Sequence, residues 1–123
     1  MSERLNILVT GGAGFIGSAL CRHLVATGLY RVVNFDKLTY AGNLDSLREI
    51  EGSADYRFVQ GDIGDQAKVS ELLAAEAIDI VMHLAAESHV DRSIAEPGAF
   101  VQTNVVGTFA LLQAALAYWR RLE

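Results

Sequence analysis

Polar side chains that could do chemistry gather in the segment HLAAESHVDRS, residues 83–93. After an apolar start it places five polar or charged residues within six positions: Glu87, Ser88, His89, Asp91 and Arg92. Serine, histidine and aspartate are the groups of a hydrolytic triad, but triad members normally converge from separate elements, and no nucleophile elbow precedes Ser88. We therefore expect this segment to contact ligands rather than to form a hydrolytic centre.

A glycine-rich segment, VTGGAGFIGSAL, offers a different chemistry. It satisfies two spacings at once, Gly12-x-Gly14-x-x-Gly17 and Gly11-x-x-Gly14-x-x-Gly17. Glycines permit a tight turn and the close approach of backbone amides to a pyrophosphate, and a helix N-terminus behind them favours an anion. Because the segment follows a predicted strand and opens a predicted helix, it indicates a dinucleotide-binding loop.

Asp36 follows Gly17 by 19 positions, at the end of the second predicted strand. A carboxylate there accepts hydrogen bonds from the ribose hydroxyls of adenosine and repels a 2′-phosphate, which favours NAD over NADP. The neighbouring Lys37 either softens that repulsion or is a solvated loop charge. Asp62, after the third strand, is either a contact to the adenine end or a cap at a helix start, and its position does not separate these alternatives.

Apolar patterns predict the elements that position these residues. Gly28 predicts a helix stop, Asp65 a helix cap, and Pro97 the first turn of a long helix. The predicted strands are 5–10, 30–36, 56–60 and 79–85; the predicted helices are 18–27, 44–50, one within 64–77, and one from 97 to the end.

Strands separated by single helices predict parallel pairing with right-handed crossovers. The expected fold class is α/β, a Rossmann-like doubly wound parallel sheet in the order 3-2-1-4, truncated relative to a complete sheet of this type. We expect one domain over residues 1–123. Its fourth strand would be an apolar edge strand, which some other part should cover.

The composition of the chain limits the classes of partner that we expect it to bind. The chain has a net charge of −5, a pI near 5.1 and no basic cluster beyond Arg120 and Arg121, so we expect no nucleic-acid partner. Charged or polar residues interrupt every apolar run, and no secretory signal is visible, so we expect a soluble, cytoplasmic chain without a membrane segment. The single Cys21 is expected to be a small buried hydrophobe, and His23 and His83 are expected to be structural.

Five segments together resemble the N-terminal part of the extended short-chain dehydrogenase/reductase family: TGGAGFIGS, DKLTYAGNLDSL, GDI, HLAAESHVDRSI and TNVVGT. The narrower motifs DKLTYAGNL and ESHVDRS are similar to the dTDP-glucose 4,6-dehydratase branch of that family. The resemblance covers nearly the whole chain but only about the first third of such an enzyme. It implies a reaction in which NAD oxidises C4 of a glucosyl unit, water leaves across C5 and C6, and the hydride returns to C6.

The resemblance also implies which residues contact each part of the ligands. For the cofactor these are Gly11, Gly14, Phe15, Ile16 and Gly17 at the pyrophosphate; Asp36, Lys37, Leu38 and Thr39 at the adenosine ribose; Asp62 and Ile63 at the adenine; and Leu84, Ala85, Ala86, Glu87, Ser88 and Thr103 beside the nicotinamide half. Ser88 would also face the hexose of a nucleotide-sugar substrate, with His89 a weaker candidate. Asn104 either shapes the helix behind the family's catalytic tyrosine or makes a hydrogen bond inside the helix. No metal ligand is expected.

The family's catalytic groups are absent from this sequence. Its base is a tyrosine with a lysine four positions later, yet the residues four after each tyrosine are Asn34, Leu44, Gln60 and Leu122. The adjacent Asp-Glu pair of the dehydration step is also missing. We therefore expect the NAD-binding part of a dehydratase, inactive alone. The alternatives are a stand-alone NAD-binding module and part of a sugar-nucleotide epimerase. The resemblance further implies a homo-oligomer built through the last helix, for which the sequence alone favours ordinary core packing. The terminal Leu122-Glu123 is either native helix or a vector remnant.

Overall fold

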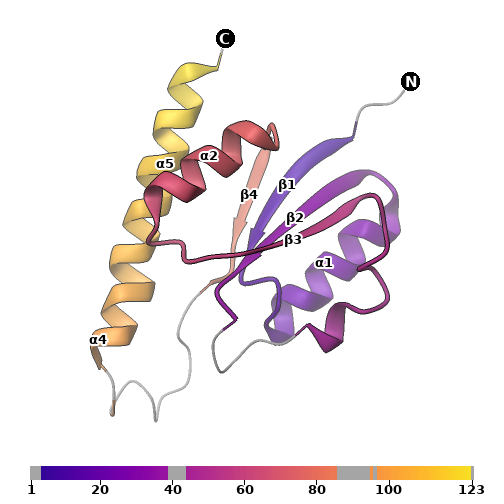
Figure 1. The fold of residues 1–123 in the computed structure, drawn as a ribbon, viewed down its shortest axis with the longest axis horizontal. Helices are drawn as coiled ribbons and strands as arrows, with labels where there is room; N and C mark the ends of the chain where they lie inside the picture. The colour runs from indigo at the N-terminus through magenta and orange to yellow at the C-terminus, as the bar shows by residue number, and fades with distance from the viewer. Residues whose placement is uncertain (1–3, 39–43, 86–94, 96, 123) are drawn as a thin grey trace.

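A computed structural model describes residues 4–38, 44–85, 95 and 97–122 of the chain. Four strands alternate with helices (Figure 1). In chain order the elements are β1 (Leu5–Thr10), α1 (Phe15–Thr27), β2 (Tyr30–Asp36), the 3₁₀ helix η1 (Asp45–Leu47), β3 (Tyr56–Gln60), α2 (Gln66–Ala75), β4 (Ile80–His83), α4 (Pro97–Phe100), the π-helical segment η2 (Val101–Gly107) and α5 (Thr108–Arg121).

The strands form one parallel sheet in the order β3-β2-β1-β4, which confirms the predicted fold class and strand order. Leu8 of β1 pairs with Val33 of β2 on one side and with Val81 of β4 on the other. Within the described chain β4 pairs only with β1, so it is the apolar edge strand that the sequence predicted. All carboxyl ends of the strands meet at one edge of the sheet, where the glycine loop begins.

Each face of the sheet has its own core, because successive strand residues point to opposite faces. Leu8, Val33 and Phe35 pack beneath α2 and α5, together with Leu73 and Leu111. On the other face, Ile7, Val9 and Val32 pack beneath α1 and η1. Figure 1 shows the resulting layers, with α2 and α5 on one side of the sheet and α1 on the other. This is a doubly wound arrangement.

The ends of several elements differ from the predictions. Residues 44–50 do not form an α-helix: Leu47, Arg48 and Ile50 donate their amides to carbonyls three residues earlier. The tighter 3₁₀ turn places Leu47 and Ile50 on one side, where both enter the core. The strand predicted over 79–85 ends at His83, because β1, its only described partner, ends at Thr10. Helix α1 begins at Phe15, three residues before its predicted start.

One helix stop and one helix cap lie where the sequence predicted them. Gly28 adopts a left-handed conformation with φ 72° and donates its amide to the carbonyl of Val25, which ends α1. The side chain of Asp65 accepts the amide of Lys68 at 3.1 Å and begins α2. These two residues therefore set the lengths of the helices on opposite faces of the sheet.

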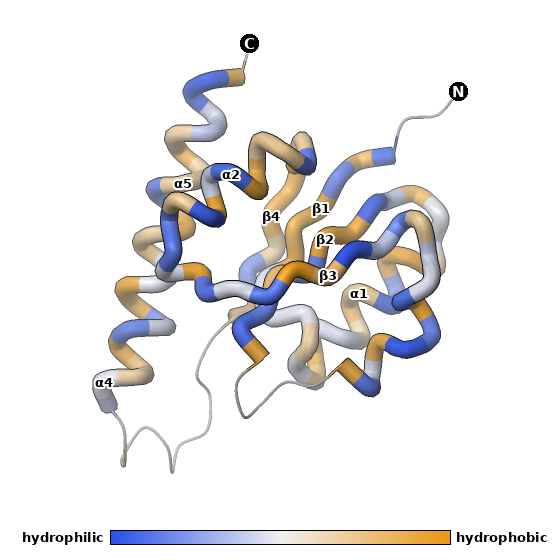
Figure 2. The backbone as a smooth tube through the Cα atoms, in the orientation of Figure 1, coloured by the Kyte–Doolittle hydropathy of each residue, from blue (hydrophilic) through white to orange (hydrophobic). Residues whose placement is uncertain are grey.

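The long C-terminal helix corrects the expectation of no membrane-length segment. Pro97–Arg121 spans 25 residues and reaches a mean hydropathy of 1.4 over its most apolar window, so by length and composition it could cross a membrane. That expectation considered unbroken apolar runs, whereas here the average is apolar despite scattered polar residues; Figure 2 shows α5 alternating between hydrophobic and hydrophilic along its length. In the fold, α5 packs on α2 and the sheet through Leu111 and Ala114.

Candidate dinucleotide site

The glycine loop joins β1 to α1 in a turn that leaves no room for a side chain at Gly11 or Gly17. Gly11 has φ 74°, and a Cβ there would lie 2.7 Å from the backbone nitrogen of Ala85. A Cβ on Gly17 would lie 2.1 Å from the carbonyl oxygen of Gly11. The loop is therefore pressed against the first turn of α1 on one side and against the residues after β4 on the other.

The start of α1 is open to a ligand. Gly14 is the N-cap residue and has no side chain to cap the helix, and the first turn contains no acidic residue. The first-turn amides of a helix lack intrahelical acceptors and carry a partial positive charge, so this end can receive an anion. Phe15 and Ile16, which follow the N-cap, are 93% and 70% exposed. Exposure on this scale fits their predicted place beside a pyrophosphate.

Asp36 closes the site from the end of β2. Its Oδ2 accepts the amide of Ala13 in the glycine loop at 2.9 Å, and its Oδ1 accepts the amide of Leu38 at 2.6 Å. The residue is only 8% exposed. A carboxylate has about four lone-pair sites, so two amides leave capacity for further donors. Asp36 thus fixes the glycine loop and keeps acceptor sites for the ribose hydroxyls that the sequence predicts there.

Lys37 and Asp62 form an ion pair, Nζ to Oδ2, at 3.3 Å. Asp62 also accepts the amide of Gly64 through Oδ1 at 2.8 Å, while the cap of α2 is Asp65. The helix-cap alternative for Asp62 is therefore wrong: it closes the turn before the helix and holds Lys37. Since the Lys37 charge is engaged by Asp62, it does less to offset the negative charge of Asp36.

Three further residues that were predicted to contact NAD differ in their surroundings: Ile63, Leu38 and Thr103. Ile63 is buried in the core, against the position where Gly107 of η2 lacks a side chain. Its side chain is apolar, so a polar contact to adenine at this position would come from its backbone. Leu38 has φ 60° and packs partly against the core beneath α1. Thr103 is half-buried within η2, a segment of the π type that often marks functional positions.

The backbone after β4 contacts the glycine loop. The amides of Leu84 and Ala85 both reach Oγ1 of Thr10, at 3.0 Å and 3.2 Å, and Gly11 lies against Ala85. Leu84 and Ala85, predicted beside the nicotinamide, are thus joined to the predicted pyrophosphate loop. The remaining predicted contacts lie outside the described residues: Thr39, Ala86, Glu87, Ser88 and His89.

Two titratable side chains lie near this edge, Cys21 and His83. The sequence predicted the surroundings of Cys21 but not the hydrogen bonds of His83. Cys21 is buried as predicted, and burial, with a smaller contribution from the charge of Asp36, raises its pKa to about 12, which makes it a poor nucleophile. His83 is more than a core residue: its ring bridges Thr10 and Thr108. Only its position at the carboxyl end of a predicted strand could have indicated this role.

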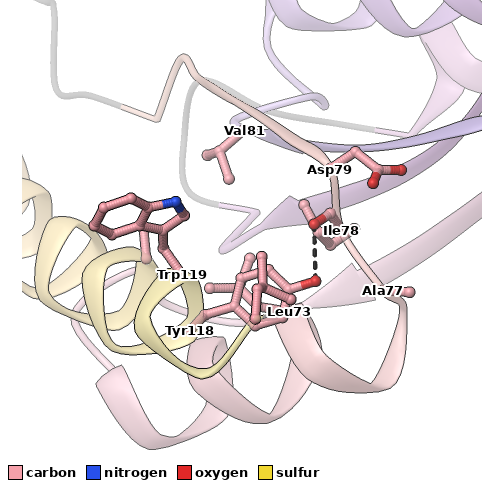
Figure 3. Close-up of a pocket in the computed structure, with 9 residues that line it drawn as sticks. Leu73, Ala77, Ile78, Asp79, Val81, Tyr118 and Trp119 are labelled. Carbon is pink, nitrogen blue, oxygen red and sulfur yellow. Dashed lines mark hydrogen bonds between the residues drawn. The ribbon is translucent and has the colours of Figure 1, made fainter.

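A separate pocket of about 410 Å³ lies at the opposite, amino-terminal end of β4. In Figure 3 Trp119 and Val81 flank it, and the Tyr118 hydroxyl donates to the carbonyl of Ile78 at 2.9 Å. Its other linings include Leu73 and Ala77, so it is largely apolar. It has no part in the dinucleotide site. No cluster of three metal-ligating side chains occurs among the residues that the structure describes.

Comparison with known proteins identifies a family and several relatives that match this chain. The family model for GDP-mannose 4,6 dehydratase matches residues 8–122. A dTDP-glucose 4,6-dehydratase from Neisseria meningitidis is 60% identical over 94% of this chain and 33% of its own length, and one from Escherichia coli is 54% identical over 97% and 33%. The chain therefore spans about a third of the length of these relatives.

Solved structures agree with the sequence relatives. A dTDP-glucose 4,6-dehydratase from Streptomyces venezuelae with NAD bound superposes with a TM-score of 0.88 at 45% identity, over 94% of this chain and 37% of that one. A UDP-glucose 4-epimerase from Brucella ovis in complex with NAD gives 0.81 at 37% identity, over 94% and 33%. Because the family match extends from Leu8 to Leu122, the chain belongs to the GDP-mannose 4,6 dehydratase family.

Proposed function

We propose that the chain is the NAD-binding part of a dTDP-glucose 4,6-dehydratase. The carrying observation is the buried carboxylate of Asp36, which holds the glycine loop through the amide of Ala13 beside an uncapped helix start. An anion-binding end and a carboxylate acceptor, placed in sequence along one sheet edge, fit the pyrophosphate and ribose of a dinucleotide. Relatives that carry this name and bind NAD support the assignment.

The residues present fit NAD better than NADP. A 2′-phosphate would bring about two negative charges beside Asp36, and the adjacent Lys37 is already paired with Asp62. When bound, NAD supplies the hydride acceptor for sugar oxidation. The chain's own residues bind its phosphates at the amides of Phe15 and Ile16, orient its ribose at Asp36, and place Leu84 and Ala85 beside its reactive half.

Catalysis by this chain alone is not part of the proposal. No tyrosine in the sequence has a lysine four residues later, and no adjacent Asp-Glu pair occurs. The chemistry therefore belongs to a protein of the relatives' length, of which this chain matches about a third. The half-exposed edge strand β4 and the apolar pocket beside it support a larger body that covers them.

The same reasoning extends to partners and location. A nucleotide sugar is the proposed substrate of the longer protein. A homo-oligomer built through the last helix is supported by the exposed apolar residues along it: Val101, Val105, Val106, Phe109, Leu112, Leu116 and Trp119. A bacterial cytoplasmic location completes the proposal, in keeping with the bacterial sources of the relatives.

The experiment is a titration of the chain with NAD and with NADP, followed by thermal unfolding and calorimetry. At a hundredfold excess over the dissociation constant, NAD should stabilise the chain by about 2.7 kcal/mol. Asp36→Ala should weaken NAD binding and lower the preference for NAD over NADP. Glu71→Ala, which removes an exposed carboxylate from α2, is the matched control and should leave both unchanged. The absence of any response to saturating NAD would overturn the proposal.

The second candidate is part of a sugar-nucleotide epimerase, favoured by the structural likeness to the Brucella ovis enzyme. Higher identity to the dehydratases argues for the first candidate.

Incubation of the chain with NAD and dTDP-glucose should give no 4-keto product. Product formation would show that the chain contains a catalytic base that the sequence does not reveal.

A further inference from the structure

Three side chains from three elements form a chain of hydrogen bonds behind the dinucleotide site. Thr10, the last residue of β1, lies with its Oγ1 2.6 Å from Nδ1 of His83, the last residue of β4. The other ring nitrogen, Nε2, lies 3.0 Å from Oγ1 of Thr108, the first residue of α5. The imidazole therefore bridges the sheet and the helix that covers it, which run side by side in Figure 1.

The hydrogen-bond capacity of Thr10 determines which ring nitrogen carries the proton. A hydroxyl accepts two hydrogen bonds and donates one. Oγ1 of Thr10 accepts the amide of Ala85 and shares the amide of Leu84 with the carbonyl oxygen of Thr10, which lies 3.0 Å from the same nitrogen. Its own proton must then be donated to Nδ1 of His83, which acts as the acceptor. The ring is consequently the neutral Nε2–H form, and Nε2–H donates to Thr108.

The surroundings of the ring favour this neutral form. His83 is half-buried, and desolvation lowers its pKa below the usual 6.5. Within the described residues no charged side chain contributes to this shift, and the partners on β1 and α5 are the neutral hydroxyls of Thr10 and Thr108. Nothing facing the ring there compensates a positive charge.

This bridge fixes the backbone that meets the glycine loop. The hydroxyl oriented by His83 is the same one that holds the amides of Leu84 and Ala85. Ala85 in turn lies against Gly11, where even a methyl group would collide with its backbone. Leu84 is also held by the carbonyl of Thr10, so it is the position of Ala85 against the glycine loop that depends on the orientation of this hydroxyl.

We propose that His83 is a positioning residue of the dinucleotide site, whose neutral Nε2–H ring orients the Thr10 hydroxyl and so holds the amide of Ala85 against the glycine loop. The proposal rests on the proposed function in that the positioned backbone is taken to border NAD. Protonation of Nδ1 would point an N–H at an oxygen whose two lone pairs are occupied. The amide of Ala85 must then lose its bond, because the amide of Leu84 keeps the carbonyl of Thr10, and the contact of Ala85 with Gly11 loosens.

The sign of the pH effect follows from burial. Because the folded chain holds His83 with a lowered pKa, the unfolded chain binds more protons as the pH falls below about 6.5. Stability from the neutral ring is fully present above that value and is lost progressively below it, down through the lowered pKa of the folded chain. NAD affinity should weaken over the same range.

Three measurements test the proposal. Nitrogen-15 NMR of the imidazole in the NAD-free chain should show a protonated Nε2, a bare Nδ1, and a ring that is still neutral at pH 6.5. His83→Phe keeps a planar ring but removes both nitrogens; it should accelerate hydrogen exchange at the amide of Ala85 more than at that of Leu84, which keeps the carbonyl of Thr10. It should also weaken NAD binding about fivefold, the effect of one ordinary hydrogen bond, and flatten the pH profile of binding below 6.5.

Two further variants complete the design. His23→Phe, at an exposed position of α1, is the matched control and should leave exchange and pH profile unchanged. Thr108→Val removes only the outer hydrogen bond and keeps the ring, so it serves if His83→Phe fails to fold; it should accelerate exchange to a smaller extent. A protonated Nδ1, a charged ring at pH 6.5, or hydrogen exchange at the amide of Ala85 that is unchanged in both variants would overturn the proposal. Failure of the wild-type chain to bind NAD would instead count against the proposed function, because the NMR and exchange results do not require NAD.

Discussion

Replacing Gly17 by alanine sets two physical effects against each other. Gly17 lies within α1, where alanine is normally about 1 kcal/mol more favourable than glycine. In this helix, however, the new methyl carbon would lie 2.1 Å from the carbonyl oxygen of Gly11 and 2.9 Å from the α-carbon of Gly12. Both obstacles are backbone atoms, which cannot rotate away as a side chain would.

The structure therefore predicts that the steric effect exceeds the helix preference. Forcing extra atoms into a packed site costs about 1–3 kcal/mol, and a backbone-to-backbone overlap belongs at the upper end. After subtraction of the helix gain, Gly17→Ala should destabilise the chain by about 1–2 kcal/mol. The glycine loop must also move away from α1, so NAD binding should weaken by more than the loss of stability alone would explain.

The assay is urea denaturation followed by circular dichroism, with NAD titration of the same samples. The matched control is Gly52→Ala, because a Cβ at Gly52 meets nothing within 4 Å. The control should change stability by no more than about 0.5 kcal/mol. If Gly17→Ala were as stable as the wild type or more so, the close approach of loop and helix on which the site is built would be refuted.

Three other substitutions test the supporting structure by the same denaturation assay. Leu111→Ala should cost about 2–5 kcal/mol because Leu111 is buried in the core beneath α5, while exposed Leu112→Ala should cost less than about 0.5 kcal/mol; similar losses would refute the packing of α5. Tyr118→Phe should cost about 1 kcal/mol through loss of the bond to the Ile78 carbonyl, and no loss would remove that bond as a support of the β4 end. Asp65→Ala should cost about 1 kcal/mol through loss of the cap of α2, and an unchanged stability would refute the role of this cap.

The strands and the glycine loop were predictable because local patterns determine them. Predicted bounds 5–10, 30–36 and 56–60 coincide with β1, β2 and β3. Each combines a short apolar or β-branched run with glycine or polar residues at its ends, so that pattern and length agree. Asp36 could be singled out because a strand end at a set distance from a glycine loop falls at a known place in this topology.

What the sequence could not show depends on contacts between distant residues. The π-helical segment η2 interrupts the last helix, which the apolar periodicity of the sequence predicted to be regular. At its end, Gly107 fits against Ile63, which is 44 positions earlier in the chain. Likewise the Thr10 to His83 contact joins residues 73 positions apart. No window of local sequence contains both members of such pairs.

Two strand-end residues hold the backbone around the dinucleotide site, and the sequence singled out only the first, Asp36. Asp36 holds the glycine loop from the side of β2, through the amide of Ala13. Thr10 holds the other wall from the side of β1, through the amides of Leu84 and Ala85. Both polar side chains are nine-tenths buried or more, and their oxygens accept backbone amides, of which that of Leu84 also reaches the carbonyl of Thr10. The buried polar side chains at the ends of these parallel strands therefore act by hydrogen bonding to the backbone of the adjoining loops. A ligand would bind to a backbone whose position Asp36 and Thr10 have already fixed.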